Sequence, residues 1–466
     1  MRAGAAFPHH VAHPPPASSP LGSATAATPL AVAPMRGRQP HRGHSQALRG
    51  CRQAGSLMND IDPSIAAQPE QADERPPELS YAALFLRFLR FGALAFGGPV
   101  AQIAMIRREL VDEEKWIGSA SFNKLLAVMQ VLPGPEAHEL CVHLGIRAKG
   151  RLGGLLAGLG FMLPGFLLML LLAWAYTRLP INGTMLGAVF LGVQGAVLAV
   201  IVRAVHRIGE HILLDAWLWL AAIAAAAASF FGVSFWIVLP AAGAAYALAS
   251  TQRYALAAVV VLIASIAAAW MLAGEQSAAG AVAVTREAAP SAAALFWAGL
   301  KGGLLTFGGA YTAIPFIRND TVGRGWMTDA QFLDGLALSG ILPAPLVIFA
   351  TFVGWISGGP AGALAITAGM FLPAFAFSLI FYEHLEAVSE HKRLQLFLAG
   401  VAAGVVGVIA ITVLDLTRST AARTPSLTLS LFIFAVSLAV MYRWKSKLAT
   451  PVVLAIGAVI GAVALR

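Results

Sequence analysis

Residues 91–99 read FGALAFGGP and residues 302–310 read GGLLTFGGA, so the motif Phe-Gly-Gly occurs twice inside apolar sequence. The regions around the two motifs, 81–147 and 291–357, consist of apolar pieces cut by Gly and Pro. Each piece is too short or too interrupted for the roughly 20 residues with which a helix crosses the hydrocarbon core. We therefore expect broken helices, which are tolerated at membrane depth only where protein or a cavity satisfies the freed backbone groups.

The two interrupted regions correspond to each other in order and spacing. Arg107 corresponds to Arg318 at the same offset as the two Phe-Gly-Gly motifs. Further matches are Trp116 with Trp326, Phe122 with Phe332, Leu132-Pro133-Gly134-Pro135 with Leu342-Pro343-Ala344-Pro345, and GFMLPGF at 160–166 with GMFLPAF at 369–375. Matches of Pro, Gly, Arg and Trp do not follow from shared hydropathy. We interpret them as an internal repeat.

The composition is that of a membrane protein. Hydrophobic residues make up 58% of the chain and charged residues 12%, whereas soluble globular proteins average about 45–50% and 25%. The mean hydropathy is +0.73. Nine further segments are long and apolar enough to be spans: 152–176, 184–203, 212–231, 233–250, 253–273, 361–382, 394–415, 426–442 and 448–465. The composition therefore predicts an all-α polytopic membrane protein.

The charges of the loops predict that the two halves have opposite orientations. Lys and Arg in short loops mark the cytoplasmic side. Loop 146–151 is strongly basic, whereas its counterpart 356–360 has no cation. The span 253–273 has no partner in the repeat, and one extra crossing would invert the second half. We expect a first repeat over 79–252, a linker helix and loop over 253–290 and a second repeat over 291–466. Loop charges do not distinguish full spans from re-entrant hairpins in the two interrupted regions.

The N-terminal residues 1–78 are predicted to be a disordered extension. They are rich in Pro, Ala, Ser and Arg, have no apolar periodicity, and lack the apolar core of a secretory signal. Residues 1–59 carry six Arg and no acid, so they supply most of the formal net charge of +9. No basic stripe interleaved with aromatic residues indicates nucleic-acid binding. The two cysteines exclude a disulfide framework and a Cys-based metal site.

The glycine motifs are the first candidates for binding a substrate. Successive backbone N–H groups near glycines form concave anion-binding nests, and a helix beginning at Pro99 would add its positive end. Two such motifs could enclose a tetrahedral dianion. The alternative is that these glycines only allow close helix packing. The candidate residues are Phe96, Gly97, Gly98, Phe307, Gly308 and Gly309, together with the Pro133-Gly134-Pro135 break.

Basic residues near the motifs are the second group of candidates. Arg90 and Lys301 each lie six residues before the Phe of a motif, so the repeat keeps a positive charge there. A cation at depth is costly and usually faces a polar cavity. The alternative is that the side chain extends to the interface from a helix end. The same two interpretations apply to Arg87, whose counterpart is Ala298. Arg107 and Arg318 are expected to be gate residues or loop anchors.

An acidic segment follows the first Pro-Gly-Pro break. Glu136, His138 and Glu139 lie at the start of a predicted helix, where acids are favoured by the helix dipole. The corresponding segment 346–349 is wholly apolar. We expect Glu136, His138 or Glu139 to be the proton-coupling group, with helix capping as the alternative for Glu136. The spacing does not suit zinc. No Walker A or dinucleotide motif is present, so we expect no metal, no cofactor and no enzymatic activity.

At these residues the sequence resembles the chromate ion transporter family in its long two-domain form. The resemblance rests on Phe91-Gly92 through Phe96-Gly97-Gly98-Pro99, on Leu132-Pro133-Gly134-Pro135-Glu136-Ala137, on Gly153-Gly154 with Leu163-Pro164-Gly165, and on Leu305-Thr306-Phe307-Gly308-Gly309. It covers about residues 80–466. It implies a multi-pass protein of the cytoplasmic (inner) membrane with two antiparallel homologous halves, which exports chromate, draws on the proton-motive force and confers chromate resistance.

Several alternatives stay open at this point. Chromate and sulfate are similar tetrahedral dianions, so glycine nests and cations alone discriminate poorly between them. A passive anion channel, a sulfate or other oxyanion uptake carrier, a membrane-embedded enzyme and a non-transporting sensor are the rival functions. The expected partners are chromate or sulfate, protons and the lipid bilayer, and a homodimer is left open. Ala344 stands where the first half has Gly134, which argues against symmetric use of the two Pro breaks.

Overall fold

The computed structural model describes residues 76–129, 132–180, 184–279, 289–307, 309–380, 391–444, 446 and 448–465, with the side chains of 274–279 left aside. The regular secondary structure of these residues is helical, without a strand, as the sequence predicts. Most of the predicted N-terminal extension (1–78) and Gly308 lie outside the described residues.

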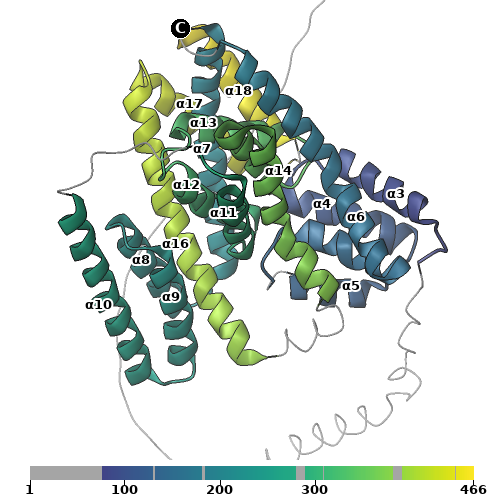
Figure 1. Ribbon diagram of the computed structural model, residues 1–466, viewed down its shortest axis with the longest axis horizontal. Coiled ribbons are helices and arrows are strands. Elements are labelled where there is room, and N and C mark those ends of the chain that lie inside the picture. The colour runs from purple at the N-terminus through teal and green to yellow at the C-terminus, as the bar shows by residue number, and fades with distance from the viewer. Residues whose placement is uncertain are drawn as a thin grey trace, which may run out of the picture. The chain divides into compact units, whose positions relative to one another are not determined.

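The first half comprises α3 (Tyr81–Ala93), α4 (Gly98–Arg107), the π-helical turn η1 (Arg108–Glu113), α5 (Ser119–Met129), α6 (Glu136–Arg178), α7 (Met185–Ile212), α8 (Ala216–Phe230) and α9 (Phe235–Ser250). After α10 (Tyr254–Ala279) come α11 (Ala292–Leu304), the 3-10 turn η2 (Ala310–Ala313), α12 (Ile314–Thr321), α13 (Asp329–Ile341), the 3-10 turn η3 (Leu346–Ile348), α14 (Phe349–Ile380), α16 (Lys392–Arg423), α17 (Leu427–Arg443) and α18 (Ala449–Ala464). Figure 1 shows their arrangement.

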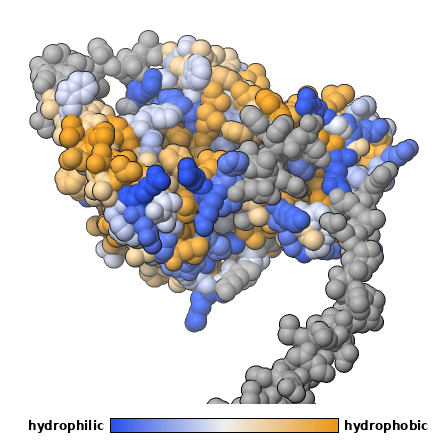
Figure 2. All heavy atoms as spheres, turned by 90° about the horizontal axis from the view of Figure 1, so that it is seen from below, coloured by the Kyte–Doolittle hydropathy of each residue, from blue (hydrophilic) through white to orange (hydrophobic). Residues whose placement is uncertain are grey.

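In the part of the chain that the structure describes, five helices are long and apolar enough to cross a membrane: Glu136–Arg178, Met185–Ile212, Tyr254–Ala273, Leu346–Ile380 and Lys392–Arg423. Four shorter apolar helices, α8, α9, α17 and α18, occupy the other predicted spans. Apolar side chains also cover much of the surface in Figure 2, because the surroundings of such helices are lipid rather than water. None of the most apolar part of α10 is buried, and α10 packs against α9.

Two of the long helices each contain a sharp glycine turn. Gly150 in α6 and Gly359 in α14 have φ of 63° and 62°, a conformation that favours glycine. The segments before and after each turn pack antiparallel, with Gly145 against Gly153 and Gly354 against Gly362. The predicted loops 146–151 and 356–360 are therefore turns of two corresponding helical hairpins.

The helices of the interrupted regions are short. α3, α4 and α5 have 13, 10 and 11 residues, and α11, α12 and α13 have 13, 8 and 13. At 1.5 Å per residue such helices are about 12–20 Å long, less than the ~30 Å of the hydrocarbon core. These lengths favour re-entrant hairpins over full spans in the interrupted regions.

The two halves exchange helices. Within each half, α3 packs on α6 and α11 packs on α14 (Figure 1). In contrast, α7 of the first half packs on α17 and α18, and α16 of the second half packs on α8 and α9. Glycines permit both contacts: Gly192 of α7 meets Gly457 and Gly461, and Gly407 of α16 meets Ala222. The halves are therefore interlocked rather than set side by side.

Candidate functional site

The first break opens the backbone at the Phe-Gly-Gly motif. α3 ends at Ala93, and α4 begins at Gly98 with Pro99 in its first turn, as the sequence predicts. Gly97 and Gly98 have φ of 92° and 78°. No side chain caps the start of α4, and a Cβ placed on Gly98 would have no heavy atom within 4 Å. The first-turn N–H groups of α4, apart from Pro99, which has none, are therefore uncapped and could donate to an anion, and Phe96 before them is 38% exposed.

At the second break a helix also ends before a glycine with positive φ, but a 3-10 turn follows instead of an α-helix. Lys301 lies in the last turn of α11, and the chain then unwinds before η2. Gly309 precedes η2 with φ of 133°. Thr306 is buried, and its hydroxyl donates to the carbonyl of Gly302 at 2.7 Å. Phe307 is half-buried, and nothing is described for Gly308.

The breaks of one half meet those of the other. The N–H of Gly134, in the first Pro-Gly-Pro break, donates to the carbonyl of Thr306 in the second glycine break at 2.8 Å. In the reciprocal contact the buried side-chain amide of Gln102 donates to the carbonyls of Ala95 and Ala344, at 2.9 and 3.0 Å. Thr306 corresponds to Ala95, and Gly134 corresponds to Ala344. All four breaks therefore meet in two corresponding cross-half contacts.

Packing explains why the second half has Ala344 where the first half has Gly134. A Cβ on Gly165 would collide with the Cβ of Ala344, and a Cβ on Gly134 would lie 3.1 Å from that of Ala374. Gly165 and Ala374 occupy corresponding positions in the repeat, as do Gly134 and Ala344. Each cross-half contact thus contains one glycine and one alanine, in opposite order. The substitution of Gly by Ala preserves the volume of the contact, so it does not argue against symmetric use of the breaks.

Arg90 and Lys301 are ion-paired within their own halves. Nη2 of Arg90 lies 3.0 Å from Oε1 of Glu109, and Nζ of Lys301 lies 2.5 Å from Oδ2 of Asp320. Both cations lie in the last helical turn before a break. Sequence reasoning missed the two acids. Each acid follows its cation by 19 residues, so the repeat alone could have identified them.

The other three predicted cations also have protein partners. Arg87 pairs with Glu114, and its guanidinium carbon lies 5.3 Å from the centroid of the Trp116 ring. Arg107 donates to Ser119 and Asn123, at 2.9 and 3.1 Å. Arg87 thus ties α3 to the loop before α5, and Arg107 ties the end of α4 to the start of α5.

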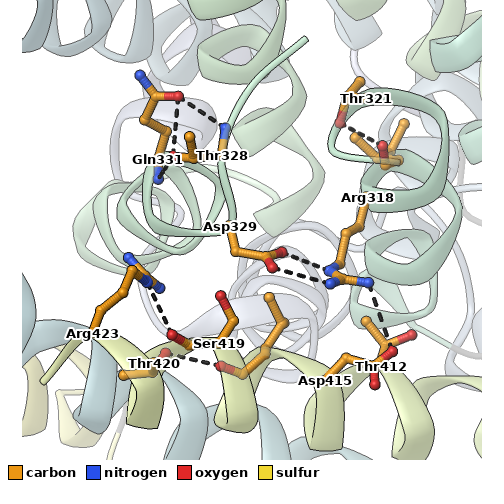
Figure 3. Close-up of polar contacts among 12 residues, drawn as sticks. Arg318, Thr321, Thr328, Asp329, Gln331, Thr412, Asp415, Ser419, Thr420 and Arg423 are labelled. Carbon is orange, nitrogen blue, oxygen red and sulfur yellow. Dashed lines mark hydrogen bonds and ion pairs between the residues drawn. The ribbon is translucent and has the colours of Figure 1, made fainter. Parts of the chain in front are cut away.

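Arg318 has the corresponding place in the second half. It donates through two nitrogens to Asp329 at 2.8 and 3.1 Å, and a third nitrogen lies 3.8 Å from Asp415 of α16 (Figure 3). Asp329 corresponds to Ser119, the partner of Arg107. Arg318 therefore anchors the start of α13, and a role for it as a gate residue stays a prediction.

The acidic segment begins α6 directly after the Pro133-Gly134-Pro135 break. His138 and Glu139 are fully buried. The His138 ring makes edge contacts with Phe371 and Phe375 of the second half, at centroid distances of 5.0 and 4.7 Å. Both carboxyl oxygens of Glu139 lack a hydrogen-bond partner among the described residues. Glu139 also lies against Gly134, so a buried carboxyl group without a partner adjoins the cross-half contact.

Glu136 lies one turn before Glu139 and is half-buried at the start of α6. Within the described residues no group of three or more His, Cys, Asp or Glu side chains is placed to hold a metal ion. A small cavity among α7, α13 and α18 is lined mainly by apolar residues such as Val197, Leu336 and Leu454, and none of its lining residues is basic. That cavity does not have the chemistry of an oxyanion site.

Comparison with known proteins shows the family to which this chain is similar. The sequence model of the chromate transporter family matches the chain twice, over residues 82–248 and 293–462. The chain is 66% identical over 379 residues to the chromate transport protein of Pseudomonas aeruginosa, covering 81% of this chain and 91% of that protein. It is 30% identical to the chromate transport protein of Cupriavidus metallidurans, covering 83% and 94% of the two chains. No solved structure matches the chain.

A double substitution tests the contact between the breaks. Gly165→Ala should destabilise the protein by about 1–3 kcal/mol, because the added methyl group collides with Ala344. The additional change Ala344→Gly should restore most of that loss. Thermal unfolding of purified protein measures both. Gly209→Ala is the matched control, because a Cβ at Gly209 would meet nothing closer than 3.7 Å. Equal unfolding temperatures for Gly165→Ala and the wild type would contradict the contact.

Proposed function

Because this chain belongs to the chromate transporter family, we propose that it exports chromate from the cell across the cytoplasmic membrane, draws on the proton-motive force and so confers chromate resistance. Two similar proteins with 66% and 30% identity carry the name chromate transport protein. Five helices among the described residues are long and apolar enough to span a membrane. The proposal adds a direction, an energy source and a site to the family's transport of chromate.

The observation that carries the proposal is the hydrogen bond from Gly134 to Thr306, with its counterpart through Gln102. These contacts bring the broken backbones of both halves together, and transporters bind substrates where broken helices meet. We propose that chromate binds beside the Phe-Gly-Gly motifs. The uncapped start of α4 would donate backbone N–H groups to its oxygens. The two halves would cross the membrane in opposite orientations.

The ion pairs near the breaks bear on how a dianion is held. Arg90–Glu109 and Lys301–Asp320 are each close to neutral, so an empty site has little net charge to repel or attract ions. The Arg90 side chain is 59% exposed whereas Glu109 is 13% exposed, so the guanidinium has nitrogens available beyond the one bonded to Glu109. We propose that Arg90 and Lys301 donate hydrogen bonds to bound chromate while Glu109 and Asp320 remain their counter-ions.

The proton-coupling role is assigned to the start of α6. A buried carboxylate without a partner is costly, and protonation removes that cost. Glu139 meets this description next to Gly134, with His138 and Glu136 on the same helix. Taking up a proton as chromate leaves would balance the charge of the site. The segment 346–349 of the second half has no ionisable residue, so coupling would use one half.

Transport assays on inverted membrane vesicles test direction and energy source. Vesicles containing the protein should accumulate chromate when a proton gradient is imposed, and collapsing the gradient with a protonophore should abolish accumulation. Cells expressing the protein should contain less chromate than cells without it. Movement of chromate only down its own gradient would indicate the channel instead. Competition by sulfate measures the selectivity between the two oxyanions.

Exchanging the charges of an ion pair tests the role of Arg90. The variant Arg90→Glu/Glu109→Arg keeps the ion pair but moves the cation to another helix. If Arg90 contacts chromate, the concentration for half-maximal transport should rise about 10- to 100-fold, since a charge-assisted hydrogen bond contributes roughly 1.5–3 kcal/mol. The control is Arg108→Glu/Glu113→Arg, a more exposed pair on η1. Wild-type transport by the Arg90 exchange would show that its ion pair is purely structural.

A further inference from the structure

A second buried carboxyl group lies away from the breaks. Asp334 of α13 is 2% exposed. It lies inside an apolar helix, and no sequence motif distinguishes it as functional. The Tyr176 hydroxyl of α6 donates to Oδ2 at 2.8 Å, and Nε2 of Gln194 of α7 donates to Oδ1 at 2.8 Å. Three helices therefore converge on one carboxyl group.

The hydrogen-bond partners of Asp334 are neutral. The charge that acts on it from a packed helix is that of Arg423 of α16, whose Nε donates to the carbonyl of Ser419. Asp329, on α13 itself, is paired with Arg318. On α16 the other ionisable residues are Asp415 and Arg418, which pair with each other, and Lys392 and Arg393 at its start. On α6 they are Arg178 beyond Tyr176, the acids and histidines that begin the helix, Cys141, and the bases Arg147, Lys149 and Arg151 around the Gly150 turn. On α7 they form the cluster 203–211 at its far end. The packed elements η3, α14 and α18 carry none.

Both partners of Asp334 can serve either protonation state. A tyrosine hydroxyl donates to a carboxylate and can equally accept from a protonated carboxyl group. The Oε1 of Gln194 is buried and has no hydrogen-bond partner among the described residues, so rotation of the amide would offer an acceptor to Asp334. A proton can therefore be added or removed at Asp334 without leaving the carboxyl group unpaired.

The cluster also joins the two halves. Tyr176 and Gln194 belong to the first half and Asp334 to the second. Relative movement of the halves would remove both donors, and a buried charge without donors is costly unless the group takes up a proton. The corresponding residue of the first half is Lys124, which is exposed, so the repeat itself does not require an acid here.

We propose that Asp334 is a second proton-binding site of the transporter, positioned by Tyr176 and Gln194, which binds and releases a coupling proton as the two halves move. The carboxylate gains one proton from water on one side of the membrane and becomes the neutral acid. It later returns that proton to water on the opposite side, with no other bond changed. This inference rests on the proposed proton-coupled export and extends it to a residue outside the breaks.

The test compares two assays on the full chain in proteoliposomes. Exchange of radiolabelled chromate between equal concentrations needs no net proton movement, whereas accumulation against a gradient does. Asp334→Asn should retain exchange and lose accumulation driven by a proton gradient. The control Asp112→Asn, on an exposed acid of η1 remote from α13 in sequence, should retain both. Tyr176→Phe should shift the pH dependence of driven accumulation, which loss of packing alone would not do.

Other outcomes have distinct meanings. Wild-type accumulation by Asp334→Asn would overturn the inference and leave proton-coupled export intact. Failure of the wild type to respond to a proton gradient would overturn export as proposed and this inference with it. If Asp334→Asn loses exchange as well or does not insert, pH-difference infrared spectra of the wild type and Tyr176→Phe decide. A protonated-carboxyl band that moves with Tyr176→Phe supports the site, and an unmoved or absent band overturns it.

Discussion

Each interrupted helix leaves backbone N–H and carbonyl groups that lipid cannot satisfy, and the architecture of this protein depends on where those groups find partners. Some find them in the opposite half of the chain. Gly134 donates to Thr306, and Gln102 bridges Ala95 and Ala344. Because Gly134, Thr306 and Ala344 each find a partner in the opposite half, the repeats are coupled at their breaks. The exchange of α7 and α16 between the halves reinforces the same dependence.

The cations near the breaks are likewise paired, each with an acid of its own half. Arg90 and Lys301 would be costly as isolated ions among apolar helices, and in each half an acid 19 residues later neutralises the cation. The retained feature of the repeat is the ion pair, since Arg–Glu in one half becomes Lys–Asp in the other. In our account of transport, these pairs keep the empty site nearly neutral and release hydrogen bonds to an entering dianion. Buried carboxyl groups at Glu139 and Asp334 supply places where a proton can offset that charge.

Much of the fold could be predicted from the sequence, because spans and breaks are local patterns of hydropathy, Pro and Gly. Examples are the start of α4 at the first Phe-Gly-Gly motif and the correspondence of Trp116 with Trp326 in the internal repeat. The partners of the candidate residues were not predictable in the same way. Gln102 corresponds to Ala313, so the repeat does not mark it, and the Gly165–Ala344 contact joins residues far apart in sequence. Asp334 lies inside an apolar helix, and its significance depends on Tyr176 and Gln194, which only tertiary structure brings near.

We propose that the glycine breaks of the two halves form one oxyanion site. The most direct measurement is the position of bound chromate, located through the anomalous scattering of chromium in crystals of the protein. We expect chromium within hydrogen-bonding reach of the N–H groups at the start of α4 and near Arg90 or Lys301. Chromium in the apolar cavity among α7, α13 and α18, or remote from both breaks, would contradict it.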